Sequence, residues 1–135
     1  MNVRYYEQIH FNLILKLNHI NYKNMSSTKK KGYRVEWKIM KIFESNNWYV
    51  VRAGGSLGEA DIVGLKNGKC ILFQIKSTKK KILYYYGYDS PKLSGFPFYL
   101  IVDFGYGKIK VTKPKKIIRE SDGVMLKDFL SRYNK

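Results

Sequence analysis

The dipeptide Asn67-Gly68 lies between two apolar runs, Ala60–Leu65 and Cys70–Lys76. Asn-Gly between such runs predicts a β-hairpin, because a type I′ turn needs positive φ at both central residues. With a two-residue loop, paired residues have numbers that sum to 135, as those of Asn67 and Gly68 do. This register fixes which side chains meet along the whole hairpin.

Four polar residues lie at the open end of the predicted hairpin. The register places Asp61 opposite Gln74 and Glu59 opposite Lys76. Opposed residues of antiparallel strands project to one face, and so do residues two apart in a strand. We therefore expect carboxylate, amide and ammonium groups to cluster on one face of the hairpin.

The chain carries a large excess of positive charge. Its 135 residues include 26 Lys and Arg against 10 Asp and Glu, a formal charge of +16. This predicts a polyanionic partner, nucleic acid before an anionic membrane surface. The sequence has no run of about 18 apolar residues, so we expect no membrane span. The single cysteine, Cys70, fits a reducing compartment such as the cytoplasm, and its place in a strand predicts a buried structural thiol.

Residues 1–24 differ in composition from the rest, since they lack Gly and Pro and are rich in Asn, Ile, Leu, Tyr and Lys. Two interpretations stay open. Met25 is the true start, and this extension comes from an upstream reading, or the extension forms an accessory helix. In both cases we expect residues 25–135 to form a single domain.

Apolar periodicity predicts two helices around a sheet. The first runs from Lys30 to Ser45 and is capped by a hydroxyl of Ser26–Thr28. The second is capped by Ser121 or Asp122. Its buried stripe comprises Leu126, Phe129, Leu130 and Tyr133. Five strands are expected, at Trp48–Ala53, Ala60–Leu65, Cys70–Lys76, Phe96–Phe104 and Lys108–Thr112. The fold class is α/β, a five-stranded mixed sheet with helices on both faces, because both faces of the hairpin are apolar away from its tip.

One helical carboxylate adds to the polar cluster. Glu36 lies at the edge of the apolar stripe, three residues before Ile39, and a carboxylate facing a core needs a cation or a metal. Together with Asp61 and Gln74 it offers oxygen ligands for Mg²⁺ or Mn²⁺, and Lys76 can orient an attacking water. These parts suit metal-assisted attack on a phosphodiester.

Basic residues flank this cluster on both sides. Lys29–Lys31 precede a helical stripe of Arg34, Lys38 and Lys41, which is either solvated or in contact with phosphates. Lys79–Lys81 lead into Ile82–Tyr86. Interleaved lysines and tyrosines suit a nucleic-acid surface, but they also suit a plain edge strand.

These residues also carry a family resemblance. Glu36, Ala60-Asp61 and Gln74-Ile75-Lys76 resemble the motif of the PD-(D/E)xK nucleases, which have the restriction-endonuclease-like fold. More narrowly, four blocks resemble the archaeal-type Holliday junction resolvases in order and spacing. They are KGYRVE (31–36), VVRAGGS (50–56), ADIVGLKNGK (60–69) and ILFQIKSTKK (71–80). The segment SDGVMLKDFL (121–130) extends the resemblance toward the C-terminus.

The resemblance implies a homodimeric, Mg²⁺-dependent endonuclease of DNA recombination and repair that nicks two opposed strands of a four-way junction. By position, the metal ligands would be Glu36, Asp61, Gln74 and the carbonyl of Ile75. Lys76 would orient the water, and Ser56 would assist catalysis. The DNA contacts would be Lys29, Lys30, Lys31, Arg34, Arg52, Lys79, Lys80 and Lys81.

The chain departs from the family pattern at three places. Gln74 stands where the family has Glu, which removes one negative charge beside the metal. Ala60 replaces a proline, and Tyr84–Gly95 is too short for the long helix that helps to form the dimer. Three alternatives therefore stay open: a nuclease for other branched or single-stranded DNA, a DNA-binding module that has lost cleavage, and a basic ribosomal or chromatin-like protein. The last would have no use for two carboxylates at metal-binding positions.

Overall fold

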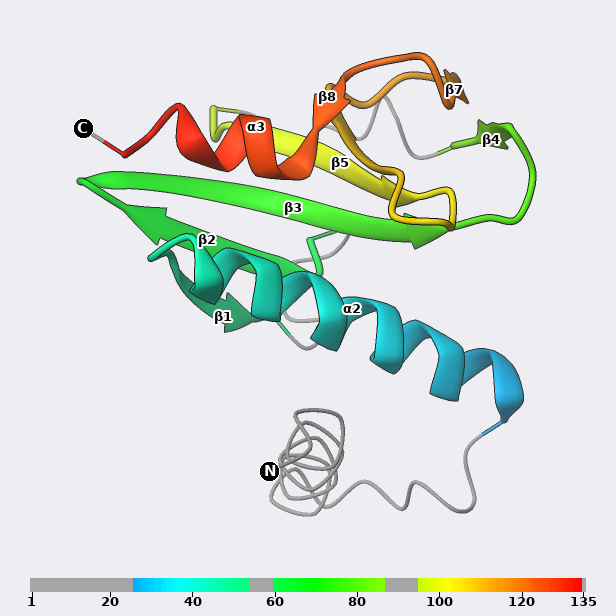
Figure 1. Ribbon diagram of the computed structural model, residues 1–135, viewed down its shortest axis with the longest axis horizontal. Helices are drawn as coiled ribbons and strands as arrows, with labels where there is room; N and C mark the ends of the chain where they lie inside the picture. Colours follow the sequence, from blue (N-terminus) through cyan, green and yellow to red (C-terminus); the bar gives the residue numbers. More distant parts are fainter. Residues whose placement is uncertain (1–25, 54–59, 87–94, 135) are drawn as a thin grey trace.

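A computed structural model of the chain describes residues 26–53, 60–86 and 95–134 (Figure 1). Two helices and eight strands make up this part of the chain. In chain order they are α2 (Ser27–Ser45), β1 (Tyr49–Arg52), β2 (Ile62–Lys66), β3 (Lys69–Ser77), β4 (Ile82–Tyr84), β5 (Phe98–Asp103), β6 (Ile109–Thr112), β7 (Ile117–Arg119), β8 (Val124–Met125) and α3 (Leu126–Ser131). The extension of residues 1–24 lies outside the described residues.

The main sheet has six strands in the order β1-β2-β3-β5-β6-β8. Only β3 and β5 pair in parallel, and the other neighbours are antiparallel, so the sheet is mixed as expected. It exceeds the expected five strands by β8, whose two residues are too few to leave a periodic signal. The segments β4 and β7 pair with each other in a separate two-stranded ribbon.

The hairpin has the register that the sequence predicts. Ile62 pairs with Phe73, Lys66 pairs with Lys69, and the two turn residues have φ of 50° and 76°. The ladder ends at the Ile62 pair, so Asp61 does not lie opposite Gln74 as a regular partner. Instead, the Asp61 N–H donates to the carbonyl of Phe73 at 2.8 Å, and its side chain turns toward the next strand.

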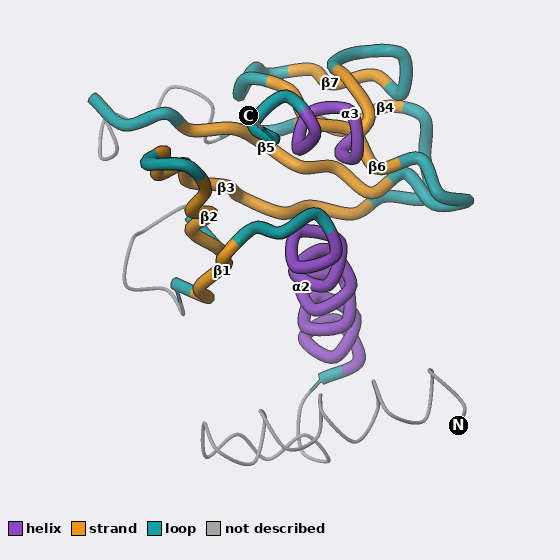
Figure 2. The backbone as a smooth tube through the Cα atoms, turned by 60° about the vertical axis from the view of Figure 1, so that its left-hand side comes forward, coloured by secondary structure: helices purple, strands orange, loops and turns teal. Residues whose placement is uncertain are grey.

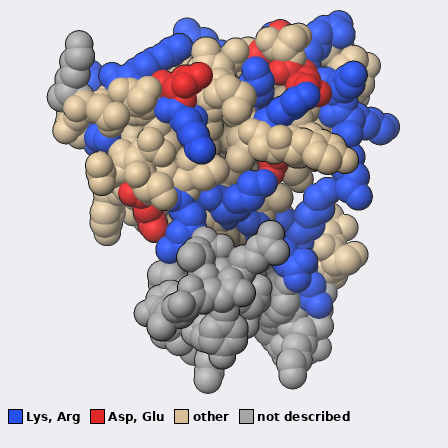
Figure 3. Space-filling model, in the orientation of Figure 1, with Lys and Arg blue, Asp and Glu red and all other residues tan. Residues whose placement is uncertain are grey.

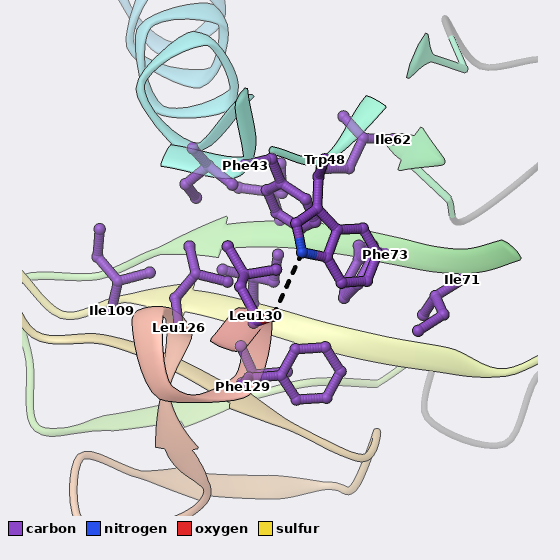
Figure 4. Close-up of a cluster of buried hydrophobic side chains, with 13 residues drawn as sticks. Phe43, Trp48, Ile62, Ile71, Phe73, Ile109, Leu126, Phe129 and Leu130 are labelled. Carbon is purple, nitrogen blue, oxygen red and sulfur yellow. Dashed lines mark hydrogen bonds between the residues drawn. The ribbon is translucent and has the colours of Figure 1, made fainter. Parts of the chain in front are cut away.

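Both helices pack on the same face of the main sheet. Phe43 of α2 and Leu130 of α3 belong to one buried cluster with Phe73 of β3 (Figure 4). Trp48 joins the two helices, since its indole N–H donates to the carbonyl of Leu130 at 3.4 Å. The prediction of helices on both faces is therefore wrong for the described part of the chain.

The ribbon β4–β7 covers part of the opposite face. Leu83 and Ile118 pack there against Leu100 and Val102 of β5. Figure 2 shows this ribbon on the side of β3 and β5 away from α2. On this face a short ribbon takes the place of the expected helix. Its alternating apolar residues bury the central residues of β5.

The predicted ends of the helices agree with the structure at one place and differ at another. Ser26 caps α2, and its hydroxyl accepts from the backbone N–H of Lys29 at 3.2 Å. For α3 the N-cap is Met125, without a side-chain bond. Asp122 accepts from the N–H of Arg119 instead, so it closes the turn after β7. Cys70 is exposed near the hairpin turn, which contradicts its predicted burial.

Candidate active site

Asp61 lies where β2 and β3 separate. Its backbone makes hydrogen bonds to the segments on both sides. Its carbonyl accepts from the N–H of Ala53 and its N–H donates to the carbonyl of Phe73, each at 2.8 Å. Its carboxylate Oδ2 accepts from the N–H of Ile75 at 2.7 Å. Burial raises the pKa of Asp61, against the lowering effects of the Ile75 N–H and the charge of Lys76. The site thus holds a half-buried carboxylate in one orientation, at the cost of partial desolvation.

Glu36 approaches Asp61 from the middle of α2. Arg52 of β1 donates from Nε to Glu36 Oε2 at 3.0 Å, and its guanidinium lies 4.2 Å from the ring centre of Tyr33. Burial raises the pKa of Glu36 against the hydrogen bond from Arg52, and the negative charge of Asp61 adds to the rise. The two carboxylates are therefore close enough to repel each other, and Arg52 offsets part of that repulsion.

Gln74 lies on β3 and is held by a tyrosine from the second sheet. The hydroxyl of Tyr85 donates to Gln74 Oε1. Tyr85 is only 5% exposed, and its backbone N–H bonds the carbonyl of Lys116 at 2.8 Å, so the ring is fixed by the ribbon. Sequence reasoning did not single out Tyr85. Its alternation with Leu83, which places both on the inner face of the ribbon, is the signal that was available.

Lys76 is exposed on β3, two residues beyond Gln74 and therefore on the same face. Ile75 between them points to the opposite face, where it is buried in the main core. The charges of Asp61 and Glu36 act on each other, and the charge of Lys76 acts on Asp61. The side chain of Gln74 contacts Tyr85 of the ribbon, and its place in a common metal site stays a prediction. The proposed carbonyl ligand, that of Ile75, belongs to the same stretch of β3.

The basic residues predicted to contact DNA take different places. Exposed members lie on the first turns of α2 and after β3, namely Lys29, Lys31, Arg34, Lys79, Lys80 and Lys81. Lys30 is half-buried, and Arg52 faces Glu36. Lys38, from the same helical stripe, makes an ion pair with Asp103 Oδ2 at 2.7 Å, so it joins α2 to β5. Ser56 and Glu59 lie outside the described residues.

The donor set of this site is small. In residues 26–53, 60–86 and 95–134, no group of three or more His, Cys, Asp and Glu side chains is placed to hold a metal ion. A cation here would therefore need the amide oxygen of Gln74 or a backbone carbonyl beside the carboxylates of Glu36 and Asp61. This dependence follows from the replacement of a glutamate by Gln74 in a chain that otherwise keeps the pattern.

Glu36 and Asp61 are half-buried carboxylates beside the mixed sheet, and the charge of Lys76 acts on Asp61. These are three residues of the nuclease pattern seen in the sequence. Residues 27–128 match the family model of the archaeal Holliday junction resolvases (Hjc), and the chain belongs to that family. It is therefore a junction-resolving nuclease that binds DNA and acts in recombination and repair. This confirms the resemblance drawn from the sequence.

Solved structures support the same fold. The chain is similar to Hjc from the archaeal hyperthermophile Archaeoglobus fulgidus, a Holliday junction resolvase, with a TM-score of 0.63 and 17% identity. The match covers 78% of this chain and 99% of the other, and at this identity it establishes the fold. No curated protein sequence matches the chain. In the described segments, neither helix is long and apolar enough to cross a membrane.

Proposed function

We propose that the protein is a cytoplasmic, Mg²⁺-dependent endodeoxyribonuclease that cuts two opposed strands of a four-way junction as a homodimer. The observation that carries this proposal is the convergence of Glu36 and Asp61. Both are half-buried, both have a raised pKa, and the charge of Asp61 contributes to the shift of Glu36. Two carboxylates that repel each other in a partly desolvated site are stabilised by a shared cation.

The residues of the site fit a hard divalent cation. Carboxylate, amide and carbonyl oxygens are the ligands that Mg²⁺ and Mn²⁺ prefer, and Glu36, Asp61, Gln74 and Ile75 offer all three kinds. When bound, the cation supplies positive charge that neutralises the phosphate and promotes deprotonation of the attacking water.

The chain's own groups have separate tasks in this proposal. The N–H of Ile75 holds the Asp61 carboxylate in place. Arg52 neutralises Glu36 and keeps it near the sheet. The exposed ammonium of Lys76 orients the water toward the phosphorus and stabilises the hydroxide that forms. Ser56 is proposed to assist, as its place in the resolvase pattern implies.

Gln74 is a neutral ligand in the proposed set, as the carbonyl of Ile75 is. It contributes an oxygen without a charge, so the site carries one negative charge less than a site with glutamate. An amide also has only one oxygen, and its NH₂ group cannot bind a cation. The hydroxyl of Tyr85 compensates for part of this by holding Oε1 in a fixed position. We expect weaker metal affinity than in a glutamate site, and retained cleavage.

A homodimer is proposed because symmetric nicking of a junction needs two active sites. The DNA contacts proposed from the resemblance comprise the basic residues on the first turns of α2, Arg52 and the run after β3. Residues 87–94, part of the segment that is too short for the dimerisation helix of the family pattern, lie outside the described residues. We therefore propose the dimer without assigning its interface.

Cleavage assays test the proposal directly. The protein is incubated with a four-way junction, a linear duplex or single-stranded DNA, in Mg²⁺, Mn²⁺ or EDTA. Paired symmetric nicks on the junction, lost in EDTA, are the expected result. Equal cutting of other branched or single-stranded DNA would contradict junction selectivity. Tight junction binding without cleavage in any metal would instead favour the binding module, which the neutral Gln74 gives a specific reason to consider.

A further inference from the structure

A recess lies beside the ribbon, and Lys81 in its lining belongs to the basic run after β3 that the resemblance places in contact with DNA. Its volume is about 690 Å³, and its lining comes from the end of the ribbon and from the strands β6 and β8. The lining residues are Lys81, Ile82, Lys108, Lys110, Arg119, Glu120, Ser121 and Met125. Figure 3 shows lysine and arginine side chains gathered at the end of the molecule where β4 and β7 lie. The recess is thus basic, with two half-buried apolar residues in its lining.

Charge in this recess is unbalanced. Four of its lining residues are cations, and only Glu120 is an anion. Glu120 pairs with Lys108, and that hydrogen bond, with the charges of Lys81 and Lys110, lowers the pKa of Glu120. In the described part of the chain, Lys81, Lys110 and Arg119 make no ion pair. The charges of Lys81 and Lys110 act on Glu120, which already pairs with Lys108, and the charge of Arg119 acts on Asp122, which already pairs with Lys115. The recess therefore keeps an excess of positive charge.

The recess is aligned with the candidate active site. Lys76 pairs with Val102 in β5, and Val102 pairs with Lys110 in β6, so these residues form one row across the sheet. Paired residues share a face, and neighbouring strands lie about 4.8 Å apart, so the backbones of Lys76 and Lys110 lie about 10 Å apart. Val102 between them is fully buried in the cluster that Ile118 and Leu83 of the ribbon help to form. Met125 is the next residue in this row.

A second link joins the recess to the end of β3. Lys81 follows Lys76 by five residues, and its carbonyl accepts from the N–H of Glu120 at 2.9 Å. This hydrogen bond joins the segment that follows β3 to the end of β7, at the edge of the recess. Lys81 thus connects the end of β3, where Lys76 lies, with the cations of the recess, and a DNA arm that follows this exposed run reaches both.

We propose that this recess binds backbone phosphates of the DNA arm next to the cleavage point. The cations Lys81, Lys110 and Arg119 meet phosphate oxygens, and Arg119 offers a planar fork suited to them. Ile82 and Met125 contact the apolar edge of the sugars. The proposal rests on the proposed function, since it takes the scissile phosphate to lie at Lys76. Lys81 is already a DNA contact that the resemblance implies, and the proposal adds Lys110 and Arg119 as positioning residues.

Binding measured in EDTA tests the recess apart from catalysis. Anisotropy of a labelled four-way junction is recorded over a series of salt concentrations for Lys110→Gln and Arg119→Gln. Each change should weaken binding several-fold and reduce the slope of log K against log salt by roughly one unit. Lys127→Gln and Arg132→Gln remove the same charge from exposed positions on or just after α3, which packs on the other face, and should change binding less than two-fold. Equal losses in all four variants would overturn the proposal, because net charge alone would then explain them.

A tethered probe locates the DNA. Ser121 is exposed at the recess, and Cys70 is the only cysteine, so Ser121→Cys in a Cys70→Ser background takes an iron–EDTA label at one place. Strand breaks on one arm, a few nucleotides from the protein's own nick, are expected. Absent or evenly spread breaks would overturn the proposal. So would a recess that binds pyrophosphate while junction binding is unchanged in Arg119→Gln, since the occupant would then be a small anion.

The two proposals can fail separately. A protein that never cuts in any metal but loses salt-sensitive binding in the recess variants refutes the proposed catalysis and keeps the recess. A protein that cuts junctions while the recess variants bind and nick normally refutes only the recess.

Discussion

The buried hydroxyl of Tyr85 donates a hydrogen bond to Oε1 of Gln74. This bond joins the ribbon β4–β7 to the candidate active site on β3. It uses one lone pair of the amide oxygen and leaves the other for a cation. A glutamate at the same place has two oxygens and does not depend on which end of the side chain faces the site. In the proposed site, the hydrogen bond from Tyr85 therefore sets which end of the Gln74 amide faces the cation.

Tyr85→Phe should weaken Mn²⁺ binding by about ten-fold, because a group that orients a metal ligand has effects of that size. In a Gln74→Glu background the same change should have less than a two-fold effect, since either carboxylate oxygen can bind the cation. Mn²⁺ affinity from calorimetry measures both, with nicking rates recorded in parallel. Tyr84→Phe, on the exposed neighbour, is the control. An equal loss in both backgrounds would show that Tyr85 acts through packing alone.

Gln74→Glu should raise the affinity for Mg²⁺ and maintain or raise nicking at low Mg²⁺. The change restores one negative charge beside Asp61 and Glu36, which a divalent cation offsets. The measurement is the nicking rate over a Mg²⁺ titration, compared with the natural chain. A lower rate at every concentration would show that the neutral amide is adapted to this site.

Asp61→Asn should stabilise the fold at neutral pH, because the folded protein raises the pKa of Asp61 above its unfolded value. A carboxyl group with a raised folded pKa binds its proton more tightly in the native state. Its favourable contribution is present below the unfolded pKa and is lost as pH rises through the folded pKa. At pH 7 the charged form is therefore the costly one, and the asparagine oxygen can still accept from Ile75.

Thermal melts measure this effect. A rise in Tm of roughly 2–4 °C is expected at pH 7 without metal, and the gain should shrink toward pH 4. Mg²⁺ should stabilise the natural chain more than the Asp61→Asn variant. The prediction is wrong if the variant melts below the natural chain at pH 7, or if Mg²⁺ stabilises both equally.

Local sequence signals predicted the hairpin and its register. Asn67-Gly68 fixed this register through its turn geometry, from Lys66 opposite Lys69 to Ile62 opposite Phe73, but the predicted pair of Asp61 and Gln74 lies beyond the end of the ladder. The bend that turns the Asp61 side chain to the N–H of Ile75 was not predictable, because it arises where the ladder ends. The contact of Tyr85 was not predictable either, because its partner, Gln74, lies eleven residues earlier on another strand.

Ion pairs between residues far apart in the sequence were not predictable either. Lys38 reads as part of an exposed basic stripe, but its partner Asp103 lies 65 residues away at the end of β5. Cys70 reads as buried in an apolar strand, yet the strand end beside the turn is open to solvent. Sequence periodicity predicts which face of a helix or strand a side chain is on. Its partners and its burial depend on tertiary packing, which periodicity does not predict.

Lys38→Met should cost about 1–3 kcal/mol of unfolding free energy. Asp103 is only 6% exposed, and without Lys38 its carboxylate keeps the hydrogen bond from the N–H of Gly105 but loses the compensating positive charge. Urea unfolding measures the change. Lys31→Met removes an exposed lysine from the same helix and should cost less than about 0.5 kcal/mol. Equal costs would mean that the Asp103 pair adds nothing beyond helix charge.

Gly123→Ala should be far more costly than Gly107→Ala, although both glycines have positive φ, +69° and +77°. The left-handed conformation alone costs an alanine about 1 kcal/mol. At Gly107 a Cβ would meet open space. At Gly123 it would lie 2.3 Å from the carbonyl oxygen of Val111, a backbone atom in β6 that cannot move without breaking the pairing with β8. We expect Gly123→Ala to cost about 3 kcal/mol or more in urea unfolding. Because β8 leads directly into α3, this variant should also lose part of the core around Leu126, seen as faster amide exchange there. Similar unfolding free energies for the two variants would show that β8 does not hold α3 on the sheet.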